Sequence, residues 1–312
     1  MSPTPTSTPT VSVSGVLVVD KPLGPTSFDV VARVKRLVRA QKAGHTGTLD
    51  PLATGVLVVC LGEAVKLQQW LTEGDKAYEA LAAFGAATTT EDAEGEVVER
   101  GDPEPLDGDR IRAALPRFTG LLEQVPPMFS AVRVGGRRLH VAARAGEHVE
   151  RMPRQVRVDA FELLELGEPA GGLRLARLAV RCGKGTYVRT LVADLGRALG
   201  VPAHLAGLRR TAAGSFTLAD AIPLDQAERL GATAPEVLAG RVLPLEEALR
   251  GWPTVLLTAG EARDLGHGKA LPLPSVPAGL CGALAPHGGL LAVCEGSAGT
   301  LRPLRVLAPS IR

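Results

Sequence analysis

The chain has few cysteines, and neither its cysteines nor its histidines show the spacing of a metal site. The four cysteines are spread over 312 residues without a C-x-x-C pair or a paired Cys/His spacing; they are Cys60, Cys182, Cys281 and Cys294. Most of them have apolar neighbours in the sequence, which favours buried free thiols in a reducing cytosol over a disulfide framework. Acids and histidines form no cluster at ligand spacing either, so we predict no metal site.

Signals for secretion and for membrane insertion are also missing. Residues 1–14 are rich in Ser, Thr and Pro and lack the basic start and long apolar core of a signal peptide, so we expect a disordered tail. Residues 270–294 contain no Asp, Glu, Lys or Arg and are long enough to span a bilayer. Four prolines and four glycines interrupt them, however, which favours the short strands and turns of a small barrel.

The chain carries no large excess of either charge, but its charges are unevenly distributed. Its 35 basic and 33 acidic residues give a formal charge of +2. Residues 30–49 hold five Lys or Arg and no acid, and residues 133–157 hold seven Arg against two Glu. Residues 91–109 hold nine acids and one Arg. A run of like charge is most often a solvated face, so each run alone is weak evidence for a binding surface.

The periodicity of the apolar residues mixes strands with helices. Strands are expected at residues 15–20, 56–61, 78–84 and 173–182, and helices at residues 27–38, 63–71, 111–118 and 186–199. Ser27 is expected to cap the first helix, and Gly135-Gly136 indicates a hairpin. No regular βαβ repeat is present, so we predict an α+β fold with a mixed, largely antiparallel sheet flanked by helices.

Length and composition predict two domains. A chain of 312 residues is long enough for two cores, and after Arg250 the composition shifts to Gly, Pro and Leu with few charges. We therefore place a larger domain at residues 15–250 and a smaller one at residues 251–312.

The segment GHTGTLDPLATG, residues 44–55, carries the clearest functional pattern. Its three glycines and Pro51 predict a tight loop just before a buried strand, which would present Asp50 on a rigid support. Taken alone, Asp-Pro and Gly-Thr usually mark turn and cap residues.

In its context, this segment resembles the signature loop of the TruB family of pseudouridine synthases, whose nucleophilic aspartate lies in this stretch. Further blocks resemble family blocks in the family's order: GVLVVDKPLGPTSFDVV, LGEAVK, DKAYEA, PPMFSAVR, GKGTYVRTLVADLG and GLRRTAAG. The resemblance covers residues 15–216, although several family members have Tyr where this chain has Phe129. Residues 133–157 resemble the family insertion that clamps the T-arm of tRNA, and residues 251–312 resemble a PUA-type RNA-binding domain, a small β-barrel.

The resemblance implies which residues carry the chemistry. Asp50 corresponds to the nucleophile, and Arg189 to the arginine that keeps this carboxylate ionised and oriented through an ion pair. Tyr78 corresponds to the tyrosine that stacks on the target uracil. Tyr187 corresponds to a second active-site tyrosine beside the sugar or the base.

Three more substrate-binding residues follow from the same resemblance. His45 corresponds to a histidine that inserts into the RNA loop beside the flipped nucleotides, and Leu208 to an apolar wall of the site. Lys21, followed by Pro22 in DKPLG, is a candidate brace for the loop that carries Asp50.

The implied reaction suits a carboxylate. Conversion of uridine to pseudouridine breaks an N-glycosidic bond, rotates the base and rejoins it through carbon, and a carboxylate can add covalently and leave again. The resemblance thus implies a cytoplasmic isomerase that acts on uridine 55 in the T-loop of tRNA, without a cofactor, a membrane or an obligate protein partner. The base must be flipped out first, and stacking on an aromatic ring contributes about 1 to 3 kcal/mol, comparable to the cost of unstacking.

Three alternatives stay open at this point. Related archaeal and eukaryotic enzymes share the loop but are guided by RNA within a protein complex; the clamp-like residues 133–157 favour a guide-free enzyme instead. A non-catalytic RNA-binding or tRNA-folding protein could keep the same fold, although the intact set of implied catalytic residues speaks against that as its sole role. A metal-dependent RNA hydrolase would need ligand clusters that do not accompany Asp50.

Overall fold

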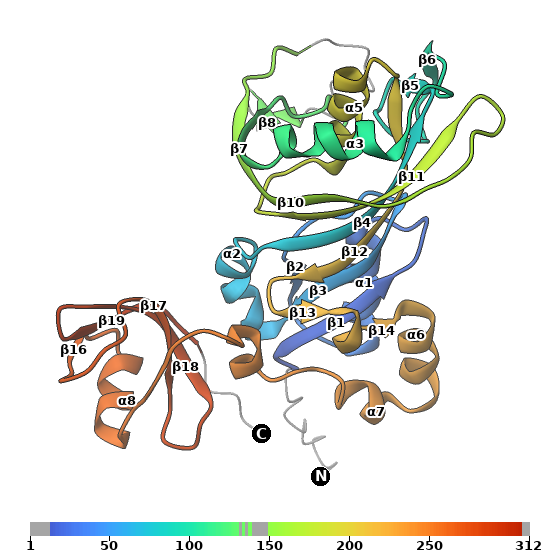
Figure 1. Ribbon diagram of the computed structural model, residues 1–312. Helices are drawn as coiled ribbons and strands as arrows, with labels where there is room; N and C mark the ends of the chain where they lie inside the picture. The colour runs from blue at the N-terminus through green and yellow to red at the C-terminus, as the bar shows by residue number, and fades with distance from the viewer. Residues whose placement is uncertain (1–12, 131–132, 135–136, 139–148, 308–312) are drawn as a thin grey trace.

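A computed structural model of the chain describes residues 13–130, 133–134, 137–138 and 149–307 (Figure 1). Residues 1–12 of the expected tail lie outside this part, as do residues 135–136 and 139–148 of the clamp-like segment. The proposed roles of these two segments therefore stay predictions.

A mixed sheet forms the body of the molecule. Its ten strands are β1 (Gly15–Lys21), β2 (Ala43–His45), β3 (Ala53–Leu61), β4 (Lys76–Phe84), β7 (Gly120–Gln124), β10 (Arg154–Leu166), β11 (Arg174–Cys182), β12 (Ala203–Ala213), β13 (Phe216–Thr217) and β14 (Ile222–Pro223). Their order is β14-β1-β3-β12-β4-β11-β10-β7, with β13 beside β12 and β2 beside β3. The pairs β1–β14 and β3–β12 are parallel and the others antiparallel, so the predicted mixed, largely antiparallel sheet is confirmed.

Helices and two small hairpins surround this sheet. The helical segments of the body are α1 (Ser27–Leu37), η1 (Gly62–Leu67), α2 (Gln68–Leu71), α3 (Gly108–Ala114), η2 (Leu115–Phe118), α5 (Val188–Leu199), η3 (Leu218–Asp220), α6 (Leu224–Thr233), α7 (Pro235–Ala239) and η4 (Leu245–Leu249). Strand β5 (Ala86–Thr88) pairs with β6 (Val97–Arg100), and β8 (Arg133–Val134) pairs with β9 (Arg137–Arg138), as expected for a hairpin there.

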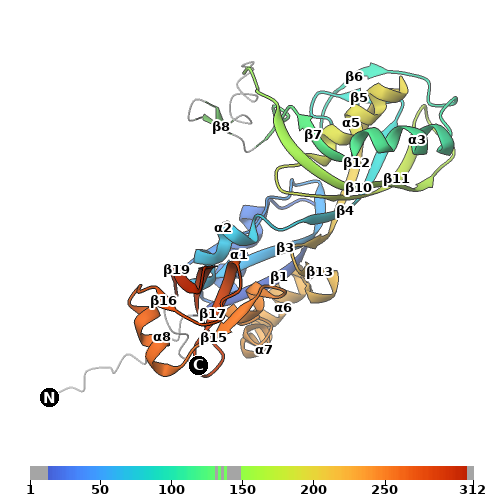
Figure 2. The same cartoon turned by 60° about the vertical axis from the view of Figure 1, so that its left-hand side comes forward.

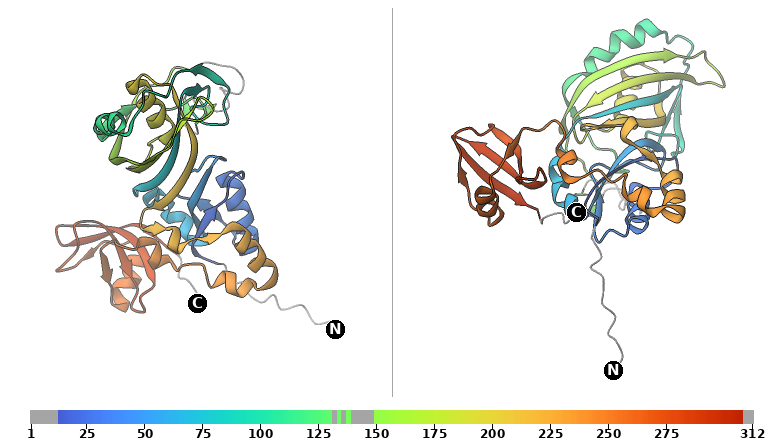
Figure 3. Two further views of the ribbon diagram at one scale, coloured as in Figure 1. Left: turned by 45° about the vertical axis from the view of Figure 1, so that its right-hand side comes forward. Right: turned by 90° about the horizontal axis from the view of Figure 1, so that it is seen from below.

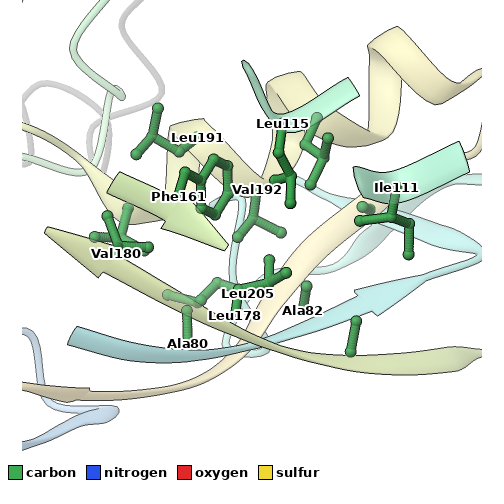
Figure 4. Packing of buried hydrophobic residues seen from close by; sticks show 14 of the residues in the cluster. Ala80, Ala82, Ile111, Leu115, Phe161, Leu178, Val180, Leu191, Val192 and Leu205 are labelled. Atoms are coloured by element: carbon green, nitrogen blue, oxygen red, sulfur yellow. The ribbon is translucent and has the colours of Figure 1, made fainter. Parts of the chain in front are cut away.

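Two apolar clusters of the body meet at the middle of the sheet. Helices α3 and α5 pack on β4, β10, β11 and β12 at one end, where Leu191 and Val192 lie over Leu178 (Figure 4). Helices α1 and α6 pack on β1 and β3, so that α6 and α7 lie at the other end (Figure 2). Tyr78 and Leu208 pack against both clusters. Residues on the central strands β4 and β12 therefore mark the junction between the two halves.

The start of α1 differs from the prediction. Thr26, not Ser27, is the N-cap residue: its hydroxyl accepts from the Asp29 N–H at 3.1 Å, and the Asp29 carboxylate accepts from the Thr26 N–H at 2.9 Å. This reciprocal capping box satisfies both N–H groups, which a cap at Ser27 could not do. Buried Ser27 instead exchanges two hydrogen bonds with the backbone of Leu49, at 2.7 and 2.9 Å, and so ties α1 to the loop beside Asp50.

Residues after 253 form a second, smaller sheet. Its strands are β15 (Thr254–Leu256), β16 (Leu271–Pro272), β17 (Gly279–Leu284), β18 (Leu290–Ser297) and β19 (Thr300–Val306), in the order β15-β17-β18-β19-β16, beside α8 (Ala259–Gly266). The sheet curls into a half-barrel and stands to one side of the body (Figure 3). Its Leu290, Val293 and Leu307 share an apolar cluster with η1, α2 and η4 of the body. The exact domain boundaries stay a prediction.

Two expectations about apolar residues can be compared with the structure. The uncharged residues 270–294 fold into β16, β17 and part of β18, which confirms that they form strands and turns. All four cysteines are buried free thiols, as expected. Across the described ranges, no helix reaches the length and apolar character needed to cross a membrane.

Strand β12 makes an unusually close contact with β3. Gly55 has φ +100°, and a Cβ built there would lie 2.2 Å from the carbonyl oxygen of Arg210. Two register shifts follow along the β12–β4 pairing, between Leu205 and Gly207 and between Arg210 and Ala212. Which side chains of β12 face the junction therefore depends on these register shifts as well as on the alternation of side chains along the strand.

We expect Gly55→Ala to lower the free energy of unfolding by about 3 kcal/mol or more, because it adds both backbone strain and a steric overlap with Arg210. Gly200→Ala is the matched control, since Gly200 has φ +72° but open space around the added Cβ, and it should cost about 1 kcal/mol. Urea unfolding of both full-length variants measures the difference. Equal losses would show that the β3–β12 contact adds no constraint.

Candidate active site

The residues before Asp50 form a loop that is fixed at several points. This Asp50 loop, residues 46–52, connects β2 to β3. The Thr46 N–H donates to the Val58 carbonyl at 3.2 Å, and the Ala53 N–H donates to the Asp50 carbonyl at 3.0 Å. Together with the Ser27–Leu49 pair, these bonds give the loop a defined conformation before any ligand binds, as the sequence predicted for a tight loop.

A buried arginine joins the loop to the rest of the site. Arg189 in α5, 5% exposed, binds the Asp50 carboxylate through Nη2 at 3.0 Å and the Asp92 carboxylate through Nη1 at 3.2 Å. The same guanidinium donates to the backbone carbonyls of Thr90 at 3.0 Å and Phe129 at 2.8 Å. One planar group thus binds four acceptors from three separate segments of the chain. The Asp50 side chain remains 40% exposed and is open to a ligand.

The surroundings of Asp50 act on its charge in opposite directions. Burial raises the pKa of the Asp50 carboxyl above its ordinary value; Arg189 and Lys21 oppose this rise, and the Asp92 carboxylate adds to it. The net direction is upward, so this carboxylate is more basic than that of a solvated aspartate. Such a group is better suited to form a covalent bond than one held at a very low pKa.

Lys21 lies at the end of β1 with its side chain fully buried. Its ammonium donates to the carbonyls of Pro22 at 2.9 Å and Pro51 at 3.4 Å. Burial lowers the pKa of Lys21 to about 8, while the negative charge of Asp50 acts in the opposite direction. The contact with Pro51 joins the end of β1 to the Asp50 loop, and the role of Lys21 as a brace stays a prediction.

The two tyrosines approach the site from different elements. Tyr78 lies on β4 at the junction of the two core clusters, beside Leu208 of β12, and burial raises the pKa of its phenol. Tyr187 precedes α5, two residues before Arg189, and burial likewise raises the pKa of its phenol. The charge of Asp50 acts on both phenols, so the structure brings both tyrosines towards the same carboxylate.

His45 lies at the end of β2, at the start of the loop. Its Nδ1 accepts from the Gly47 N–H at 3.3 Å, and burial together with the charge of Arg210 lowers the pKa of the imidazole. The ring is therefore neutral at physiological pH and shapes the turn before Asp50. Insertion of this ring into an RNA loop stays a prediction.

Three residues of this site escaped the sequence analysis. Asp92 belongs to the acidic run of residues 91–109, a pattern that favours a solvated face, yet it is buried against Arg189. Its neighbour Glu91 has φ +62° and accepts from the Thr190 hydroxyl at 2.6 Å. This left-handed residue lets two consecutive acids contact two consecutive residues of α5.

Gln124 of β7 is the third. The side chain of Tyr187, the N-cap residue of α5, makes no capping hydrogen bond. Buried Gln124 instead binds the backbone of Tyr187. Its Oε1 accepts from the Tyr187 N–H at 2.8 Å, and its Nε2 donates to the Tyr187 carbonyl at 3.0 Å. A lone glutamine at a strand end carries no sequence signal for this role.

The reactive groups do not line the apolar pocket beside the Asp50 loop. That pocket has a volume of about 700 Å³ and lies beside the loop, with Leu23, Pro51 and Glu94 among its lining residues, but neither Asp50 nor Arg189 contributes to it. Nowhere in the described part of the chain do three His, Cys, Asp or Glu side chains gather so that they could hold a metal ion.

The sequence is similar to known protein families and to proteins of known name. Three family descriptions match: "TruB family pseudouridylate synthase (N terminal domain)" over residues 35–188, "tRNA pseudouridylate synthase B C-terminal domain" over residues 189–250, and "tRNA Pseudouridine synthase II, C terminal" over residues 252–308. Proteins named tRNA pseudouridine synthase B are similar in sequence. The one from Cupriavidus metallidurans is 46% identical over 97% of both chains, and the one from Pseudomonas aeruginosa is 48% identical over 85% of this chain and 86% of its own.

Solved structures extend the similarity to the fold. A chain of "Crystal Structure of a Cbf5-Nop10-Gar1 Complex" superposes with a TM-score of 0.71 at 28% identity, over 96% of this chain and 86% of that chain. A chain of "Structure of H/ACA RNP bound to a substrate RNA containing 2'-deoxyuridine" gives a TM-score of 0.70 at 26% identity, over 95% and 86%.

Removal of Asp92 should destabilise the protein, because it leaves a buried guanidinium with one carboxylate fewer. We expect Asp92→Ala to lower the free energy of unfolding by about 3 kcal/mol. Arg177 offers a matched control, since it also bridges two acids, Glu79 and Glu165, at 3.2 and 3.1 Å, but on the surface. Glu165→Ala should cost less than about 0.5 kcal/mol. Chemical denaturation tests both; similar losses would mean that the burial of Arg189 adds nothing.

Proposed function

The chain belongs to the TruB family of pseudouridylate synthases, and on that premise we propose that it converts uridine 55 in the T-loop of tRNA to pseudouridine. Relatives that carry the name tRNA pseudouridine synthase B and span almost the whole chain support the choice of tRNA as substrate. The observation that carries the proposal is the ion pair between buried Arg189 and Asp50, where Asp50 lies in the segment that resembles the family's signature loop. Such an enzyme would act in the cytoplasm.

Asp50 is the proposed nucleophile. Arg189 binds Oδ2 of the carboxylate, so we expect the other oxygen, Oδ1, to attack the nucleoside. The net reaction breaks the bond between N1 and C1′, forms a bond between C5 and C1′, and transfers one proton from C5 to N1. Substrate and product have the same composition, so the carboxylate is regenerated and no redox partner or cofactor is consumed.

The base is proposed to reach Asp50 by flipping out of the T-loop. Tyr78 stacks on the uracil, Leu208 forms an apolar wall, and Tyr187 lies beside the sugar or the base. The location of Tyr78 and Leu208 at the junction of the two core clusters supports this, since side chains packed on both sides keep little freedom to lose when a base binds. Lys21 braces the loop through Pro51, and His45 approaches the RNA from the other end of the loop.

A guide-free enzyme is the form that we propose. The relatives named tRNA pseudouridine synthase B are 46–48% identical, whereas the chains from complexes with Nop10 and Gar1 or from H/ACA RNP are 26–28% identical. Activity of the purified protein on a bare T-arm hairpin would distinguish the two forms. A tRNA-folding role could accompany the reaction, and it would survive loss of the nucleophile.

Replacement of Asp50 should abolish the reaction and spare binding. We expect Asp50→Asn to form no pseudouridine in unmodified tRNA, while the Kd for tRNA stays within about tenfold, because phosphate contacts dominate RNA affinity. Mapping of pseudouridine and filter binding measure the two effects. Asp264→Asn in α8, whose carboxylate pairs with Lys269 on the surface, is the control and should keep full activity. Turnover by pure Asp50→Asn protein would remove Asp50 from the role of nucleophile.

The pH dependence of the rate should report the environment of Asp50. Because burial raises the pKa of Asp50 above 3.8 and the reaction needs its carboxylate, the single-turnover rate should fall as the pH decreases through a value above 3.8. The charge of Lys21 lowers this pKa, so Lys21→Met should move the acid limb to higher pH. Lys269→Met, a surface change, should leave the limb in place. An acid limb that moves to lower pH in Lys21→Met would contradict this account.

A further inference from the structure

Arg210 of β12 is a buried cation that the reaction described so far does not use. Its side chain is 1% exposed and is the largest among the fully buried ones. Its Nε donates to the Val56 carbonyl at 2.7 Å and its Nη2 donates to the Gly47 carbonyl at 3.1 Å. Among the acids in the described ranges, none lies within ion-pair distance of it. Burial of a charged group without a countercharge costs free energy, so fold stability does not explain why an arginine occupies this position.

The hydrogen-bonding partners of Arg210 lie in the proposed site or next to it. Tyr78 is its direct partner in the β4–β12 register, which places both side chains on one face of the sheet, and the guanidinium interacts with the phenol. Gly47 belongs to the Asp50 loop, and a Cβ built there would lie 3.4 Å from Nη1 of Arg210. Val56 lies on β3, the strand that follows the loop. A single planar group thus joins the loop, the strand that follows it and the stacking tyrosine.

We propose that Arg210 is a positioning residue for pseudouridine formation. It holds the Tyr78 ring and the Gly47 carbonyl in one arrangement, so that a base stacked on Tyr78 meets the carboxylate of Asp50. With 1% of its surface exposed, Arg210 acts through these two residues and not by contact with the RNA. The inference rests on the proposed function, and it assigns the second arginine of GLRRTAAG a task within it.

The adjacent arginine provides a matched control. Arg209 precedes Arg210 on the same strand, but its side chain lies on the other face, 41% exposed, and pairs with Asp20 at 2.7 Å. The two residues have the same chemistry and nearly the same place in the chain, yet only Arg210 contacts Tyr78 and the Asp50 loop. An effect of arginine loss on the strand as a whole would appear in both variants.

The test uses the full-length protein and an unmodified T-arm hairpin under single-turnover conditions. We expect Arg210→Met to slow pseudouridine formation by about 100-fold, the effect of a misplacement of roughly 1 Å, while the Kd for the hairpin stays within about threefold. Arg210→Lys keeps the charge but loses the planar fork, and should be about tenfold slower than the wild type. Arg209→Met should remain within about twofold. Rates of both Arg210 variants within threefold of the wild type would overturn the proposal.

A double-mutant cycle separates positioning from general loss of structure. Tyr78→Phe removes the phenol oxygen with which Arg210 interacts, so Arg210→Lys should slow the Tyr78→Phe protein clearly less than it slows the wild type. Fully additive effects would contradict action through Tyr78. If Arg210→Met does not fold, the lysine variant and this cycle decide the question. If the wild-type protein itself forms no pseudouridine, the proposed function falls and this inference with it; if the wild type is active, only the Arg210 assignment is at risk.

Discussion

The guanidinium of Arg189 is the point on which the candidate site depends. It is buried, and it binds two carboxylates and two backbone carbonyls. The most distant of these partners in the sequence, Asp50, lies 139 positions before Arg189. Because removal of one carboxylate from a buried ion pair is strongly destabilising, the fold holds these partners together before any RNA arrives. The free-energy cost of burying Arg189 is offset by the stability of the whole fold. As a result, the Asp50 carboxylate is held in position before a substrate binds.

The location of the site follows from the architecture of the sheet. Helices cover two separate parts of it, and the central strands β4 and β12 contribute Tyr78 and Leu208 where the two cores meet. The parallel pairing of β3 with β12 places the end of the Asp50 loop directly beside Leu208. Asp50, Tyr78, Leu208 and Arg189 thus come from a loop, two strands and one helix, and residues of each of these four elements contribute to a core cluster.

Local signals in the sequence predicted part of this arrangement. Glycines and proline marked the Asp50 loop, and apolar periodicity located most strands and helices. The resemblance implied that Asp50 and Arg189 form an ion pair, which the structure contains. Asp92, Gln124 and Arg210 could not be found in that way, because their roles arise from contacts with residues that are distant in sequence. The same limit explains Ser27, whose hydroxyl was expected to cap α1 but instead binds Leu49. The charge run that contains Asp92 looked like solvated surface because burial leaves no trace in composition.

The two arginines of β12 make the length of this strand as important as its composition. Successive residues of a strand face opposite sides, and the register shift between Arg210 and Ala212 is already part of the pairing with β4. Loss or gain of one residue between Leu208 and Ala213 would exchange the buried arginine with the exposed one. We therefore expect this stretch to tolerate point substitutions on its outer face during evolution but to reject insertions and deletions. Relatives of this chain should differ here in residue type but not in the number of residues.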